Sequence, residues 1–460
     1  MLDQGKAQKI FDQVKKFSSS KELEIIFAAT NYSLTRFANN TIHQNVAETN
    51  EIASIRVAFD GKTARATTNR FDDESLKRAV QSAESIAKVQ EPNPELLPLA
   101  SATEGKLEKP APNRWFEQTA ATTPADRAQA VSEIVTVARK NKLTTAGIYS
   151  SAESVDGLIN SSGLSTFHRR TSAEVSITML AEDSSGWQKF NSPNVRDLEH
   201  LRLAEVAAQK ARDSRSPKEL SPGKYTVVLE PAAVLDLVGF MFWDFAGMAI
   251  LDQRSFLNNR IGTKLFGENV SITDDVYHPL QSGVPFDGEG VRRKQLMLVD
   301  KGVIKNLVYA RSTAEKMRHS DYAGKVGAIA STGHGFPLPN EMGEAPANIV
   351  FVTGGGEQTI EQMIAGTERG ILITRLWYIR EVDPYEKILT GMTRDGTFLI
   401  EDGKAKHGIR NFRFNQSLID MLSSVEAQGR PVRASGEESF DMVVPAMKVR
   451  DFNFTEVTKF

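Results

Sequence analysis

Residues 231–259, PAAVLDLVGFMFWDFAGMAILDQRSFLNN, decide how this chain folds. They follow a strand-like run at 225–230 and begin with Pro231, a residue suited to the first turn of a helix. Apolar residues recur at helical spacing, namely Val234, Leu235, Val238, Phe242, Phe245 and Ala249. Because the other faces are apolar as well, the pattern predicts a helix buried in a core. The alternative, a membrane span, is disfavoured by Asp236 and Asp244 within the run.

The composition is that of a globular protein with several domains. The chain has 460 residues, of which 40% are hydrophobic and 25% charged, and its net charge is −2. Such a charge predicts no bulk attraction to nucleic acid or to a membrane surface. There is no cysteine, which excludes disulfides and thiolate metal ligands. Residues 1–17 form an amphipathic pattern rather than a signal peptide, so the expected location is the cytoplasm.

Residues 1–90 predict an N-terminal α+β domain. Residues 2–17 have a helical pattern, and Asp60-Gly61 marks a tight hairpin between two strands. Asp72 is expected to cap a helix that continues to about residue 89. The inward face of that helix is predicted to hold Leu76, Val80, Ala83 and Ile86.

The middle of the chain predicts a linker and a second α+β segment. Residues 91–113 are rich in proline, which indicates a linker or an extended wrapping segment. In the central segment, 114–220, Thr123 and Pro124 have the pattern of a helix start, and a further helix is predicted at 197–212. Alternating runs after residue 143 predict strands.

Residues 221–460 predict a strand-rich C-terminal domain built around the buried helix. Asp300-Lys-Gly302 indicates a hairpin, and short helices are predicted at 359–369 and 415–425. The fold class expected for the whole chain is therefore α+β and multi-domain, with antiparallel sheets and packed helices.

The strand, the helix and the Asp252-Gln-Arg-Ser-Phe256 that follows resemble the third domain of the TldD/PmbA family, the TldD/TldE-type metallopeptidases. Residues 333–340 (GHGFPLPN), 349–356 and 391–400 (GMTRDGTFLI) carry the resemblance further. Residues 35–42 (TRFANNTI) are similar to the signature of the family's first domain. The resemblance covers essentially the whole chain, and it implies the fold that the pattern of elements predicts.

The family's zinc motif is degenerate in this chain. In the catalytic subunit type, TldD, the helix carries His-Glu-x-x-x-His, which falls here on residues 243–248, WDFAGM. Trp243 and Met248 then occupy the ligand positions, Asp244 that of the base, and Ser435 that of a third, cysteine ligand. An indole does not ligate zinc, and a thioether favours copper(I). The chain therefore resembles the subunit type without the motif, TldE or PmbA, with no cofactor of its own.

The resemblance implies that the helix lines a cleft for an extended peptide. Phe242, Trp243, Phe245 and Met248 would form its apolar wall and Asp244 a buried carboxylate, while plain core packing of these residues is the alternative. Because positions five apart lie about 140° around a helix axis, Trp243 and Met248 share one cleft only if the helix is distorted. His334, between two glycines, is a weaker cleft candidate, and an ordinary loop position is favoured for it.

The acidic and glycine-rich segments are predicted to be ordinary surface loops. Asp274-Asp275 and the segment 287–289 are expected to be solvent-exposed, although they could bind a divalent cation weakly. Gly354-Gly-Gly356 lacks the spacing of a dinucleotide site and the lysine of a P-loop, so a flexible turn is expected there.

The resemblance implies a non-catalytic, metal-free subunit of a dimeric, cytoplasmic peptidase complex. Its partner would be a TldD-like subunit that carries the zinc, or a second copy of the chain, and its substrate an unfolded peptide. Family members are often labelled modulators of DNA gyrase, but the charge predicts no direct contact with nucleic acid. Two alternatives stay open: a stand-alone hydrolase with a rebuilt site at Asp244, Asp252 or a distant histidine, and a dimeric scaffold without activity.

Overall fold

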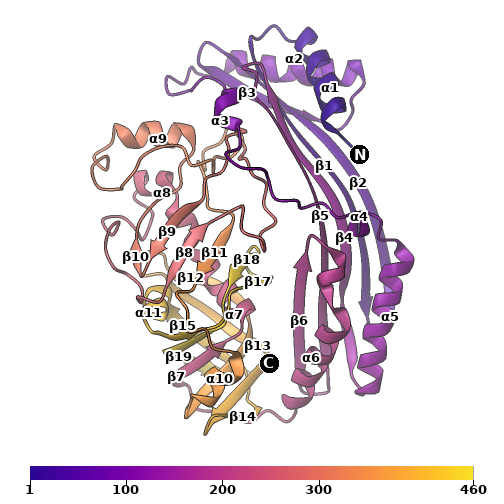
Figure 1. Cartoon of the computed structure of the whole chain (residues 1–460), viewed down its shortest axis with the longest axis vertical. Coiled ribbons are helices and arrows are strands. Elements are labelled where there is room, and N and C mark those ends of the chain that lie inside the picture. Colours follow the sequence, from indigo (N-terminus) through magenta and orange to yellow (C-terminus); the bar gives the residue numbers. More distant parts are fainter. Residues whose placement is uncertain (459–460) are drawn as a thin grey trace.

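Residues 1–458, which the computed structural model describes, form three β-sheets with helices packed against them. Figure 1 shows an N-terminal half built on one long curved sheet, beside a C-terminal half that contains the other two sheets. The predicted α+β, multi-sheet class is confirmed. No helix within these residues is both long enough and apolar enough to cross a membrane.

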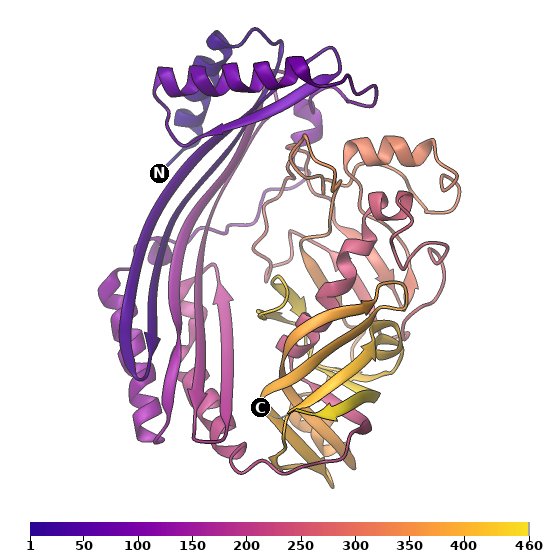
Figure 2. The same cartoon turned by 180° about the vertical axis from the view of Figure 1, so that it is seen from behind.

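The sheet of the N-terminal half is antiparallel, with the order β3-β2-β1-β4-β5-β6. Its strands are β1 (Glu22–Ala38), β2 (Thr41–Phe59), β3 (Lys62–Thr68), β4 (Thr144–Asn160), β5 (Ser165–Leu180) and β6 (Ser185–Ser192). The long strands curve together along one side of the molecule (Figure 2). The hairpin predicted at Asp60-Gly61 is confirmed, and both residues have the positive φ that a tight turn needs, 48° and 79°. Strands from both predicted N-terminal segments share this sheet, and the predicted domain limits stay a prediction.

Helices cover this sheet at both of its ends. They are α1 (Gln4–Phe17), α2 (Asp73–Val89), α5 (Pro124–Lys140) and α6 (His200–Asp213), with the short α3 (Ala102–Gly105), α4 (Glu117–Ala120) and η1 (Val195–Leu198) between them. Asp72 and Thr123 cap α2 and α5 as predicted. The prediction that Ile86 faces inward is wrong, because it is 44% exposed. The buried face of α2 runs instead through Ala83, Glu84 and Ala87, and Glu84 accepts a hydrogen bond from Ser18.

Two sheets with parallel and antiparallel pairs form the C-terminal half. In one, β12-β7-β19-β15-β13 closes on itself because β12 also pairs with β13; β14 and β16 extend it. The strands are β7 (Gly223–Leu229), β12 (Arg369–Asp383), β13 (Ile388–Glu401), β14 (Lys404–Gly408), β15 (Phe412–Ser417), β16 (Val425–Gln428) and β19 (Met447–Val457). The other sheet has the order β10-β9-β8-β11-β18-β17. Its strands are β8 (Ser271–Asp274), β9 (Leu296–Asp300), β10 (Val303–Ile304), β11 (Ile349–Val352), β17 (Val432–Ala434) and β18 (Met442–Val444).

The helices of this half pack into the core between the two sheets or at its edges. They are α7 (Pro231–Val238), η2 (Gly239–Phe245), α8 (Gly247–Leu251), α9 (Arg311–Arg318), α10 (Ile360–Ala365) and α11 (Leu418–Ser423). The predicted helix at 415–425 is too long, because residues up to Ser417 pair with β13 before Ser417 caps α11. The helix predicted at 359–369 ends earlier, since β12 already begins at Arg369. The hairpin at Asp300-Lys-Gly302 is confirmed.

Candidate functional site

The apolar run that begins at Pro231 is divided into three helical segments. After α7 the chain tightens into the 3₁₀ helix η2, and after Ala246 it resumes as α8. Ala246 itself has an extended backbone, with φ −73° and ψ 134°. The prediction of one continuous helix is therefore wrong, while the burial predicted for its apolar residues is confirmed for α7 and for most of η2.

The break has a local cause in backbone hydrogen bonding and close packing. The N–H of Gly247 donates to the carbonyl of Val308 at 3.0 Å, and the N–H of Val308 donates to the carbonyl of Phe245 at 2.9 Å. A Cβ on Gly247 would lie 2.4 Å from the ring of Tyr309, so only glycine fits there. The neighbouring segment thus takes over the hydrogen bonds that a continuous helix would use. The consequence is that Trp243 and Asp244 lie at the end of a short segment instead of inside a long one.

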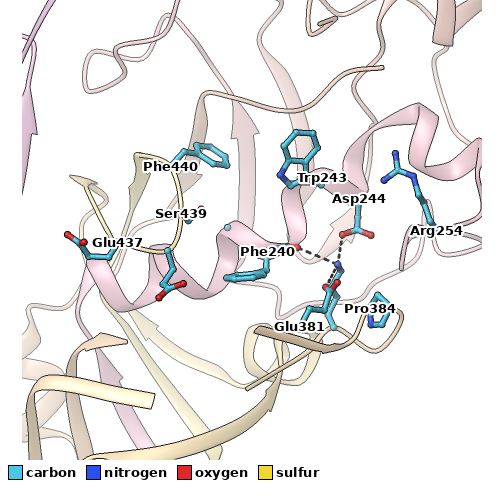
Figure 3. Close-up of a pocket in the computed structure, with 12 residues that line it drawn as sticks. Phe240, Trp243, Asp244, Arg254, Glu381, Pro384, Glu437, Ser439 and Phe440 are labelled. Atoms are coloured by element: carbon cyan, nitrogen blue, oxygen red, sulfur yellow. Dashed lines mark hydrogen bonds and ion pairs between the residues drawn. The ribbon is translucent and has the colours of Figure 1, made fainter. Parts of the chain in front are cut away.

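A pocket of about 690 Å³ opens along η2. Its lining is Gly239, Phe240, Trp243, Asp244, Arg254, Glu381, Pro384, Lys387, Glu437, Glu438, Ser439 and Phe440. Trp243 is 46% exposed, and its ring stacks on Phe336 with centroids 5.8 Å apart. Figure 3 shows Trp243 and Phe440 on one side of the pocket and Glu437 and Arg254 toward its two ends. We call this the η2 pocket; it combines exposed aromatic rings with charged side chains.

At the floor of the η2 pocket, one lysine bridges two carboxylates. The Nζ of Lys387 lies 2.6 Å from Oδ2 of Asp244 and 2.6 Å from Oε1 of Glu381 (Figure 3). Oδ1 of Asp244 accepts the N–H of Phe256 at 3.1 Å. Burial raises the pKa of the Asp244 carboxyl, and the ammonium of Lys387 opposes that rise. Lys387 is almost completely buried, so it is a fixed positive charge at the position where Asp244 could otherwise act as a base.

The side chains at this site do not fit a zinc ion. Zinc takes imidazole, thiolate or carboxylate donors, and catalytic sites hold three of them with one open position. Trp243 offers no donor, and two of the carboxylates that line the η2 pocket, those of Asp244 and Glu381, already share the ammonium of Lys387. Within residues 1–458, no group of three or more His, Cys, Asp or Glu side chains is arranged to hold a metal ion.

Met248 lies beyond the break and opens to a different pocket. Its N–H donates to Oε1 of the buried Glu344 at 2.9 Å. Its side chain lines a space of about 650 Å³, together with Leu97 of the proline-rich segment and His319. The distortion that the shared cleft required is present at Ala246, yet Trp243 and Met248 line separate pockets. A role for these two residues in holding peptide stays a prediction.

The remaining predicted site residues are divided between the core and the border of the η2 pocket. Phe242 and Phe245 are buried in the main core of the C-terminal half. Ser435 is buried directly after β17, and the segment that follows it, 437–440, lines the η2 pocket. The structure thus places Trp243 and Asp244 in one pocket, and Ser435 does not line it.

His334 and the acidic loops form a buried polar cluster. His334 is fully buried, with Nε2 3.2 Å from Oδ1 of Asp274 and Nδ1 2.9 Å from Oγ1 of Thr332. Burial acts to raise the pKa of the Asp274 carboxyl, but the pairing with His334 holds it below its usual range. The expectation that Asp274-Asp275 and 287–289 are solvent-exposed is wrong, because Asp274, Asp287 and Glu289 are all buried. Backbone N–H groups satisfy Asp287: those of Glu289 and Val291 on Oδ1, and that of Gly335 on Oδ2.

Lys387 and Glu381 were missed by sequence reasoning. Glu381 lies near the end of β12 and Lys387 in the turn before β13, both more than 130 residues after Asp244, in a charged stretch typical of a solvated hairpin. No spacing rule connects them with the helix. Lys387 has a positive φ of 50°, but the sequence gives no sign of this backbone conformation.

Family models match most of the chain. The model described as the PmbA/TldA metallopeptidase C-terminal domain matches residues 222–456, which is more than half of the chain. Those described as PmbA/TldA metallopeptidase domain 1 and central domain match 23–87 and 116–215.

Individual relatives are distant in sequence and close in fold. The chain is 22% identical to Metalloprotease PmbA of Escherichia coli O157:H7 over 411 residues, 86% of this chain and 84% of that protein. An uncharacterized protein of Methanocaldococcus jannaschii is 26% identical over 262 residues, 55% of this chain and less than two thirds, 59%, of its own length. The crystal structure of TldE from Thermococcus kodakarensis superposes with a TM-score of 0.84 at 20% identity, covering 98% of this chain and 100% of that one. A Thermotoga maritima protein, described as a candidate modulator of a DNA gyrase, gives 0.85 at 20% identity with the same coverage.

Proposed function

Since this chain belongs to the PmbA/TldD metallopeptidase family, we propose that it is the metal-free subunit of a TldD/TldE-like peptidase complex. It shapes the cavity of that complex and holds unfolded peptide, while a TldD-like partner supplies the zinc and the chemistry. The observation that carries the proposal is the ion pair of Lys387 with Asp244 and Glu381, because Asp244 occupies the position of the base in the family's zinc motif. The likeness in fold to the Thermococcus kodakarensis TldE supports it.

The electrostatics of the η2 pocket support a role without metal. A divalent ion would have to displace a buried ammonium that lies 2.6 Å from each of two carboxylates. The ammonium of Lys387 offsets the buried charge of Asp244, and the half-buried Glu381 is its second acceptor. Asp244 is therefore engaged as an ion-pair acceptor rather than poised as a general base, which needs a proton to take and a water to activate.

The surface near the η2 pocket supports peptide holding. Trp243, Phe336 and Phe440 offer aromatic surface, and Glu437 and Glu438 offer carboxylates. In the described part of the chain, β6 is the end strand of its sheet, so its second edge has no strand partner. Strand addition at β6 combined with side-chain contacts at η2 suits an unfolded peptide better than a folded protein.

The test combines metal analysis with reconstitution. We expect the purified full chain to contain no stoichiometric zinc and to cleave no peptide by itself. Mixed with a relative that carries an intact His-Glu-x-x-x-His motif, it should co-elute in size-exclusion chromatography, and the complex should cleave unfolded peptide until a chelator is added. Stoichiometric zinc together with turnover by the isolated chain would overturn the proposal. Recovery of a homodimer that does not bind the zinc-containing relative would also contradict the proposal.

A further inference from the structure

A second pocket, of about 720 Å³, lies between the two halves of the molecule. Strands β5 and β6 of the N-terminal half form one wall, and β12 and β13 of the C-terminal half form the other. The residues that matter are Trp187, Arg375, Trp377, Arg394 and Asp395. Glu437 lines this pocket and the η2 pocket alike, so the two adjoin.

Two tryptophans and two arginines are stacked alternately along this pocket. The guanidinium carbon of Arg375 lies 4.5 Å from the ring centre of Trp187 and 5.2 Å from that of Trp377. The guanidinium of Arg394 lies 4.8 Å from the ring centre of Trp377. Stacking on aromatic rings fixes the plane of a guanidinium and reduces its hydration. The order Trp187–Arg375–Trp377–Arg394 therefore holds two cations in defined orientations at the pocket wall; we call it the Trp–Arg stack.

Some N–H groups of the two arginines in the Trp–Arg stack have no hydrogen-bond partner among residues 1–458. Arg375 is only 6% exposed and donates from Nη1 to Oδ2 of Asp395 at 2.8 Å, but its buried Nε has no partner among residues 1–458. Asp395 also accepts from Oγ of Ser185 at 2.6 Å. Nε of Arg394 lies 3.7 Å from Asp395, beyond hydrogen-bond distance, and the Arg394 side chain is 49% exposed. Arg394 thus presents an oriented fork of N–H groups that the described chain does not use.

The charge of the Trp–Arg stack fits a single negative charge. Two arginines face one aspartate, Asp395, which leaves one positive charge in excess. Glu437, the other acid of the pocket, lies 3.6 Å from Nζ of Lys189, which lies at the same distance from Glu174. A planar carboxylate matches the fork of a guanidinium with two parallel hydrogen bonds, whereas a phosphate dianion would meet the carboxylate of Asp395 with unbalanced charge.

We propose that this pocket binds a carboxylate of the peptide substrate, with the guanidinium of Arg394 as its receptor. The proposal rests on the proposed function, because it names the end of a peptide whose body lies in the η2 pocket. A chain that crosses Trp243 and passes Glu437 enters the second pocket and brings a carboxylate to Arg394. The carboxylate belongs to the C-terminus of the peptide or to an acidic side chain near it, and both present the same two oxygens.

Calorimetric titration of the full chain with three short acetylated alanine–serine peptides tests the site. The first has a free C-terminus, the second an amidated one, and the third an amidated C-terminus preceded by glutamate. We expect the free or the glutamate peptide to bind at least about tenfold more tightly than the amidated neutral one. In Arg394→Gln that difference should disappear, with the amidated peptide unchanged. Arg260→Gln is the matched control, because Arg260 is also stacked on a ring, Tyr385 at 4.4 Å, outside the pocket.

The outcomes separate the two proposals. If the preference for a carboxylate persists in Arg394→Gln, or is absent from the unaltered chain, the proposal of a carboxylate site is wrong. Binding of the amidated peptide would still support peptide holding at the η2 pocket. If none of the peptides binds, peptide holding is contradicted as well. Tryptophan emission gives a second readout, since a carboxylate at Arg394 should change the emission of Trp377 only when Arg394 is present.

Discussion

The first two segments of the divided helix, α7 and η2, each carry a buried aspartate, and the two aspartates have different partners. Asp236 on α7 and Asp244 on η2 are both buried aspartates on one apolar segment. Asp236 has no ion-pair partner in the described part of the chain, and its Oδ1 accepts the N–H groups of Glu437 at 3.2 Å and Glu438 at 3.0 Å. Asp244 instead meets the ammonium of Lys387.

The two buried carboxylates are stabilised in different ways and have different structural roles. Burial raises the pKa of Asp236 to about 7, because two backbone N–H groups offset desolvation only in part. For Asp244 the opposing effect is that of a full positive charge. Asp236 therefore holds the loop that forms the wall of the η2 pocket, while Asp244 holds the charged floor. Both tasks stabilise the pocket.

Removal of the lysine should give the largest effect. Lys387→Met leaves Asp244 as a buried carboxylate without a cation, so we expect the free energy of unfolding to fall by about 3–5 kcal/mol. Urea denaturation at pH 7 measures it. Methionine is unbranched like lysine and only one atom shorter, so that packing changes little.

The double variant Asp244→Asn/Lys387→Met is the matched control, because it removes both charges. It should recover a large part of the loss, giving a coupling energy between the two positions. Equal losses in the single and the double variant would show that the ion pair contributes nothing and that Lys387 only fills space.

The break between η2 and α8 should also be sensitive to a single methyl group. In Gly247→Ala the new Cβ would lie 2.4 Å from the ring of Tyr309, and we expect a loss of about 1–3 kcal/mol from overpacking. Gly324→Ala is the control, since nothing lies within 4 Å of its Cβ position. Thermal unfolding of both variants measures the difference. If Gly247→Ala is as stable as the control, the junction of η2 and α8 is looser than the packing indicates.

The sequence predicts the burial of α7 but not the break of the helix at Ala246. The burial of α7 and the caps at Asp72 and Thr123 follow from local spacing, which the sequence contains in full. The break at Ala246 depends on the carbonyl of Val308, a partner 62 positions further on. Local periodicity does not report such a competitor, so a continuous helix was the natural prediction.

The polar residues of the site show the same limit more strongly. Trp243 and Asp244 occupy motif positions, whereas Lys387 lies in a turn without a motif, and Arg394 lies in 391–400, a stretch that carries the resemblance without any site role attached to it. Burial of Asp287 depends on N–H groups from its own turn and from Gly335. An acidic side chain is exposed by default, and only the fold supplies the donors that make its burial tolerable.

A pH series sharpens the contrast between the two aspartates. The pKa of Asp236 in the folded protein, about 7, lies above its ordinary value of 3.8, so its contribution to stability is complete below about pH 4 and is lost as the pH rises through 7. Asp236→Asn lacks this titration. Relative to the unaltered chain, the variant should therefore gain stability as the pH rises from 4 to 7, by at most about 1.4 kcal/mol per pH unit. Thermal unfolding at several pH values measures the slope, and parallel profiles would contradict the assignment.

Truncation of the exposed indole should have the smallest effect on stability and a clear effect on binding. Trp243 is 46% exposed and loses mainly its contact with Phe336 in Trp243→Ala, so the free energy of unfolding should fall by no more than about 1 kcal/mol. Leu201→Ala on α6, at a residue 48% exposed in the other half, is the control for removal of surface apolar area. If the η2 pocket holds peptide, Trp243→Ala binds the amidated peptide more weakly while Leu201→Ala binds it as the unaltered chain does. Equal affinities in both variants would place the body of the peptide outside the η2 pocket. The difference between Asp236 on α7 and Asp244 on η2 would then concern the stability of the fold and not the binding of peptide.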